Sequence, residues 1–167
     1  MTSASDLGTR AAANAHDLDP IRADQVVRRK SVLLPLAAMT AGDTQTVQAV
    51  MTVPAHVAGG IQVQTIKYVP SAIITSNSTN YKTLSFTKIS ATGSNDATGG
   101  HEVATMTTKT AGAGGIGTTV ALGTYSATLN TAIGYRKLAV GEAVGLTVTG
   151  ATMALPAALV EIVYDEL

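Results

Sequence analysis

From Ser31 onward, hydrophobic and polar residues alternate in short segments, which are separated by clusters of glycine, asparagine, serine and proline. A period of two over about four to eight residues is typical of strands with one buried face. The pattern predicts about eight strands, at 31–38, 44–53, 61–68, 83–87, 102–108, 118–122, 144–148 and 160–164. Strands at such near-regular spacing, with no amphipathic helix of ordinary length among them, predict an all-β fold, an antiparallel, jelly-roll-like β-sandwich.

Two of these strands carry a more detailed pattern. In residues 44–53, every second residue from Val47 to Val53 is apolar, which predicts that these four side chains share one buried face. In residues 61–68, the apolar positions change phase at Thr65, as a β-bulge requires.

The first 30 residues differ from the rest of the chain in charge and in apolar content. They hold nine of the 22 charged residues and few sizeable apolar side chains. Such a segment cannot build its own core, so residues 1–30 are predicted to form an extended N-terminal arm and residues 31–167 the β-sandwich domain. Within the arm, Asp19 and Pro20 predict the start of a short helix that ends near Arg28, Arg29 and Lys30.

Charge is scarce in this sequence. Lys and Arg number 11 and Asp and Glu number 11, so the formal net charge is zero, and charged residues make up 13% of the chain against about 25% in an average protein. A surface with so few charges is prone to association, so we expect neighbouring molecules to cover much of it. The chain has no run of about 18 apolar residues and no secretory signal pattern, which predicts no membrane partner and assembly inside the cell.

Residue types that carry catalytic chemistry form no constellation in the sequence. Cysteine is absent, which excludes thiol catalysis and zinc–cysteine sites. Gly112, Gly114 and Gly117 match the spacing of a dinucleotide-binding turn, but a strand pattern follows where that motif needs a helix. The histidines lack the spacing of metal ligands, and no G-x-S-x-G motif occurs. We therefore expect no enzyme activity, no cofactor and no metal site.

Two stretches of the sequence carry a resemblance to a viral protein family. Residues 60–75 read GIQVQTIKYVPSAIIT and are followed at 80–86 by NYKTLSF, and residues 140–147 read VGEAVGLT, with Pro156 before the last strand. This succession of strands and loops, with a glycine-rich loop between the two stretches, resembles the small decoration, or cement, proteins of tailed-bacteriophage capsids. The resemblance extends over about residues 32–164 and leaves the first 30 residues outside.

The resemblance implies a structural virion protein, assembled in the host cytoplasm and located on the outer capsid surface. It implies a β-sandwich, often a homotrimer, that clamps neighbouring subunits of the major capsid protein and stabilises the head against internal DNA pressure. The family pattern contains no catalytic signature, so it assigns no role to any single residue.

On this interpretation, the arm makes a second contact, with a neighbouring capsid or decoration subunit, which raises affinity through effective concentration. A single cationic triplet on a neutral chain is a weak footprint for nucleic acid, so none is expected as a partner. The arm residues expected to touch the protein partner are apolar (Ile21, Val26 and Val27) or cationic and paired with carboxylates (Arg22, Arg28, Arg29 and Lys30).

Three other classes of protein are compatible with the sequence. One is another phage structural subunit, from a tail, a connector or a fibre. A second is a receptor-binding or carbohydrate-binding sandwich, although sugar sites usually expose tryptophan, which this chain lacks. A third is an enzyme on a sandwich scaffold, for which the sequence offers no candidate site.

Overall fold

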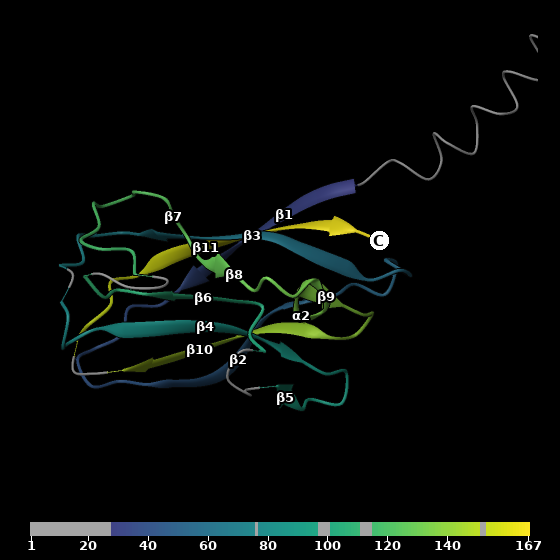
Figure 1. The fold of residues 1–167 in the computed structure, drawn as a ribbon, viewed down its shortest axis with the longest axis horizontal. Coiled ribbons are helices and arrows are strands. Elements are labelled where there is room, and N and C mark those ends of the chain that lie inside the picture. The colour runs from purple at the N-terminus through teal and green to yellow at the C-terminus, as the bar shows by residue number, and fades with distance from the viewer. Residues whose placement is uncertain (1–27, 76, 97–100, 111–114, 151–152) are drawn as a thin grey trace, which may run out of the picture.

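Two antiparallel β-sheets pack face to face (Figure 1) in the computed structural model, which describes residues 28–75, 77–96, 101–110, 115–150 and 153–167. The predicted all-β sandwich is therefore confirmed. Among these residues, no helix is both long and apolar enough to cross a membrane.

Each sheet has a central pair of long strands with shorter strands on one side. The first sheet contains, in order, β1 (Arg28–Leu36), β11 (Ala158–Glu166), β3 (Ile61–Pro70) and β7 (Tyr125–Ser126), with β9 (Lys137–Leu138) also paired to β3. The second contains β2 (Gln45–Thr52), β10 (Ala143–Gly150), β4 (Lys82–Ile89), β6 (Ala104–Thr107) and β8 (Thr128–Leu129), with β5 (Asn95–Asp96) also paired to β4. A one-turn helix, α2 (Ile133–Arg136), precedes β9.

The strand pairing is that of a jelly roll. The first long strand pairs with the last (β1 with β11) and the second with the next to last (β2 with β10), while β3 pairs with β7 and β4 with β6. These are the pairings of one long antiparallel hairpin. The hairpin rolls into two sheets because β11 also pairs with β3, and β10 with β4. As a result, the long strands β1 and β2 form the outer edges of the two sheets on one side of the sandwich.

A β-bulge in β3 sets which of its side chains reach the core. The register between β3 and β11 shifts at Gln64, which is left as the additional residue. The buried positions accordingly change from Ile61 and Val63 to Ile66 and Tyr68. The phase change predicted at Thr65 is confirmed.

In β2, a bulge overturns the predicted alternation. Met51 pairs with Val144 and Ala49 with Gly145, so Val50 is the additional residue. Ala49 is exposed, whereas Val50 and Met51 both pack against the core. The prediction that Ala49 and Met51 share one buried face is therefore wrong, because the bulge interrupts the period of two between them.

The hydrophobic core lies between the two sheets and is built from the inward side chains of their central strands. Each of these strands contributes aliphatic or aromatic side chains that are completely buried, and the chain's only phenylalanine is among them. The largest are Tyr68, Phe86, Ile61, Ile66, Leu84, Leu146 and Ile162.

The strand predicted at 118–122 is not formed, and a turn stands in its place. The backbone amides of this segment do not form a strand ladder. Thr119 N donates to Ile74 O (2.9 Å) in a loop, and Leu122 N donates to Pro70 O (2.7 Å), at the last residue of β3. Leu122 adopts a left-handed conformation, with φ of 59°, which ends any extended run. The prediction was wrong because apolar alternation in a loop does not by itself supply a strand partner.

The Tyr68 hydroxyl is a polar group inside this core. It is fully buried and forms no hydrogen bond with the described residues. Burial raises the pKa of the phenol to about 12, against about 10 in an unfolded chain.

Replacing Tyr68 with phenylalanine is expected to remove a loss of stability at high pH. Above about pH 10 the unfolded chain releases the phenolic proton, whereas the folded chain keeps it up to about pH 12. Wild-type stability is thus complete below the unfolded pKa and falls by about 3 kcal/mol as pH rises through the folded pKa. Denaturant titrations between about pH 8 and pH 12 should show a shallower decline for Tyr68→Phe. Equal slopes for both proteins would contradict the expected pKa.

Candidate functional site

The cationic triplet Arg28, Arg29 and Lys30 forms the start of β1. The prediction that a helix ends at these residues is wrong, because they pair in register with the C-terminal end of β11. The sandwich therefore begins by Arg28, ahead of the predicted boundary at Ser31. The other residues predicted to touch a partner lie outside the described residues (Ile21, Arg22, Val26 and Val27), as does the predicted helix start.

Arg29 forms a two-pronged ion pair with Asp165 of the same chain. Its Nε donates to Oδ1 at 2.9 Å and its Nη2 to Oδ2 at 3.3 Å. The hydrogen bond to this carboxylate and its negative charge raise the pKa of Arg29. Arg28 faces Glu166 on the same pair of strands. Carboxylates of β11 thus offset part of the charge of the triplet, which weakens its attraction for the phosphates of a nucleic acid.

An apolar groove of about 340 Å³ lies on the outer face of the first sheet, where β1 and β3 end and β11 begins. Pro35, Leu159 and Val69 pair across the three strands and point away from the core. The ion pair between Lys67 and Glu161 (2.8 Å) lies one outward position further along β3 and β11. The full lining is Pro35, Leu36, Val69, Ser71, Leu122, Ala157, Ala158 and Leu159.

The wall formed by Leu122 is held in place by the backbone. Its amide donates to Pro70 O, and the neighbouring Val120 amide donates to the Tyr125 hydroxyl at 2.7 Å. The Leu122 side chain is nevertheless 74% exposed. A bulky residue with positive φ costs about 1 kcal/mol or more relative to an ordinary conformation, and such strain is found most often where ligands bind. The turn thus presents an apolar side chain in a fixed position.

The open edges of the two sheets are poorly suited to adding a further strand. The edge strand β1 carries Arg28, Arg29, Lys30 and Pro35, and charges and proline are the usual means of blocking edge pairing. The edge strand β2 contains a bulge at Val50, which interrupts its ladder. The groove is therefore a better candidate for partner contact than either edge.

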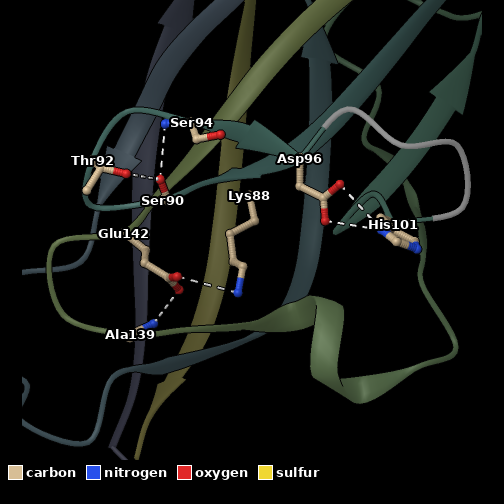
Figure 2. A network of polar contacts seen from close by, with 8 residues as sticks. All are labelled: Lys88, Ser90, Thr92, Ser94, Asp96, His101, Ala139 and Glu142. Atoms are coloured by element: carbon tan, nitrogen blue, oxygen red, sulfur yellow. Dashed lines mark hydrogen bonds and ion pairs between the residues drawn. The ribbon is translucent and has the colours of Figure 1, made fainter.

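A polar network ties the turns together at the other end of the sandwich (Figure 2). Glu142 lies 3.5 Å from the Lys88 ammonium and accepts a hydrogen bond of 2.7 Å from the Ala139 amide. The Ser90 hydroxyl contacts that of Thr92 and accepts a hydrogen bond from the Ser94 amide. These contacts fix the turns β4–β5 and β9–β10, which is a structural role.

His101 and Asp96 form the part of this network closest to catalytic chemistry. The imidazole Nδ1 lies 3.1 Å from Asp96 Oδ2, and the ring stacks on Tyr135 with a centroid distance of 4.5 Å. A carboxylate that orients a histidine is two thirds of a catalytic triad. However, the Ser90 and Thr92 hydroxyls of Figure 2 contact each other in a turn apart from the imidazole. Through its contacts with Asp96 and Tyr135, His101 joins the segment before β6 to β5 and to α2.

The sequence analysis did not predict that Lys82 is buried. It is 0% exposed, and its ammonium donates to the Asp43 carbonyl oxygen. Hydrogen bonds from the Thr40 hydroxyl and amide, with a smaller contribution from the Lys82 charge, lower the pKa of the Asp43 carboxyl. Lys82 therefore ties the loop between β1 and β2 to the first residue of β4. The sequence did contain a signal for this burial, because Lys82 lies two and four residues before the buried Leu84 and Phe86 and so falls on the same face of β4.

Within the described part of the chain, no three histidine, aspartate or glutamate side chains gather as a metal site would require. The fold and its surfaces define an all-β jelly-roll sandwich with an apolar outer groove. No family model matches the sequence, and no curated protein matches it.

Proposed function

We propose that this chain is a structural virion protein, a decoration or cement protein that binds the outer surface of the major capsid protein lattice of a tailed phage. It would act there as a homotrimer and stabilise the head. The observation that carries the proposal is the apolar groove on the outer face of a sandwich. The exposed side chains of Leu122 and Leu159 meet in this hollow, and concave surfaces lined mainly by apolar side chains are the usual form of binding sites.

Two further features support a structural role. Charged residues make up only 13% of the chain and cancel, so close packing of many copies meets little electrostatic repulsion. The chain also enters and leaves the sandwich at one corner, because Arg28 and Glu166 pair in register (Figure 1). The segment before Arg28 therefore joins the sandwich beside Glu166.

Binding to undecorated phage capsids tests the proposal. We expect saturable binding in a fixed ratio to the major capsid protein, and a higher temperature of capsid rupture. Quantitative mass spectrometry of washed particles gives the ratio, and light scattering during heating gives the rupture temperature. Binding limited to a few copies per particle would instead indicate a tail, connector or fibre subunit. Binding to a glycan array without capsid binding would indicate a carbohydrate-binding module.

Removing the arm is expected to lower capsid occupancy without unfolding the sandwich. The deletion should end at residue 27, because Arg28, Arg29 and Lys30 belong to β1 and hold its pairing with β11. The second, linked contact would be lost, so the apparent affinity should fall by about 100-fold or more. The circular dichroism spectrum of the shortened protein serves as the control for folding. Unchanged occupancy and rupture temperature would show that the arm has no role in decoration.

A further inference from the structure

The groove on the first sheet has the properties of a preformed binding surface. Leu122 and Leu159 line it with 74% and 45% of their side chains exposed. Hydrogen bonds from the turn 119–122 to Ile74 and Pro70 fix its wall, so binding would require little ordering of the protein. Two further exposed aliphatic side chains, Ile73 and Val120, lie on the two loops that these hydrogen bonds join.

The shape and chemistry of the groove select its occupant. Its lining is almost entirely apolar, and the nearest charges on the sheet, Lys67 and Glu161, neutralise each other. A volume of about 340 Å³ is suited to a few aliphatic side chains that project from a partner segment, rather than to a flat surface. Extension of the sheet by an added strand is disfavoured at the β1 edge, which carries three cations and Pro35.

The chain itself contains a segment of matching chemistry. Residues 1–27 lie outside the described structure, and four of their six sizeable apolar side chains fall in the last ten residues, at Leu18, Ile21, Val26 and Val27. The residues from Leu18 to Val27 span about 33 Å when extended. The segment is therefore long enough to reach the sandwich of a neighbouring molecule.

The direction of β1 favours a groove on another molecule over the groove of the same chain. β1 runs from Arg28 towards Pro35, so the preceding residues leave the sandwich at the end remote from the groove, about 23 Å away. A return in the same chain needs a reversal at Arg28, and it would use Val26 and Val27 to cover this distance before Ile21 reached the groove. We propose that residues 1–27 of one copy bind in the apolar groove of a second copy, with Ile21 and its apolar neighbours against Leu122 and Leu159.

Photo-crosslinking in the full-length protein tests this contact. A benzoylphenylalanine replaces Ile21, and in a second variant Val26, in an equal mixture of unlabelled and ¹⁵N-labelled chains. After irradiation, mass spectrometry should find cross-links from either position to the groove peptides around Pro35 or Leu159. Pairs that join a labelled to an unlabelled peptide should be present among them, because the two peptides come from different chains, whereas links within one chain give no mixed pairs.

Groove variants make the test specific. Leu122→Asp and Leu159→Asp each place a carboxylate against the aliphatic arm, and each cross-link yield should fall about tenfold or more. Both side chains are exposed, so the melting temperature should change little. The control is Ile133→Asp, which changes a side chain of similar exposure on α2, at the opposite end of β3, and should leave the yield unchanged.

Other results would overturn the proposal. Cross-links within single chains alone would show that the arm folds back on its own sandwich. Cross-links that survive both groove substitutions, or that avoid the groove peptides, would show that the arm binds elsewhere. The inference extends the proposed role of the arm, but the test uses purified protein without capsids. The cross-linking result is therefore independent of capsid binding: either test can succeed when the other fails.

Discussion

Replacing Phe86 with alanine is expected to destabilise the sandwich by about 4 kcal/mol, because a large aromatic side chain is lost from a closed core. Phe86 is completely buried in the middle of the second sheet, where it pairs with Leu146 on one side and Ala104 on the other. The sheets on both sides of the cavity are fixed by their ladders, so little collapse can offset the loss. The melting temperature should fall by about 10 °C or more.

Denaturant and thermal unfolding of Phe86→Ala and wild type measure this difference. Ile133→Ala is the matched control, because Ile133 is 49% exposed and its replacement should change stability by less than about 1 kcal/mol. A loss for Phe86→Ala no larger than for the control would mean that Phe86 does not pack between the sheets as described.

Alternation along the chain predicted most of the long strands because each has one face on the core. The phase change in β3 was readable, since Ile66 and Tyr68 stand out of step with Ile61 and Val63. The same rule, carried two residues back from Leu84, would have placed Lys82 on the buried face of β4. Its charge suggested a surface position, and the acceptor that allows burial, the Asp43 carbonyl, is 39 residues away.

Features set by pairing between distant segments could not be predicted. Arg28 and Arg29 follow Val26 and Val27 without the alternation that indicates a strand, and they are extended because β11 supplies Glu166 and Asp165 opposite them. The bulge in β2 is likewise visible only against β10. The sequence therefore defined the interiors of strands better than their ends.

The groove illustrates the same limit for the candidate site. Its walls come from β1, β3, β11 and the turn at Leu122, which are brought together by the jelly-roll pairing of the first strand with the last. None of these segments is unusual alone, and the turn was predicted as a strand. Scarcity of charge led to the expectation that neighbours cover the surface, but strand order determines where this groove lies.

Replacing Gly60 with alanine is expected to destabilise the protein by about 4 kcal/mol, for two reasons that a control can separate. Gly60 has a φ of +81°, which costs an alanine about 1 kcal/mol. An added Cβ would also lie 2.3 Å from the Leu138 carbonyl oxygen, inside the pairing of β3 with β9. A shift there would disturb the hydrogen bond of 2.9 Å from the Leu167 amide to Gly60 O, which fixes the C-terminus.

Gly93→Ala is the matched control for this substitution. Gly93 has a φ of +85°, nearly that of Gly60, but its added Cβ meets nothing within 4 Å. It should therefore show the conformational cost alone, about 1 kcal/mol, and the difference between the two variants measures the clash at Leu138. Equal losses of unfolding free energy for the two variants in denaturant titrations would show that β9 moves away from the added Cβ at no cost in stability. In that case the close approach of β3 and β9 contributes little to the fold, and the corner at Arg28 and Glu166 is held by the pairing of β11 with β1 and β3.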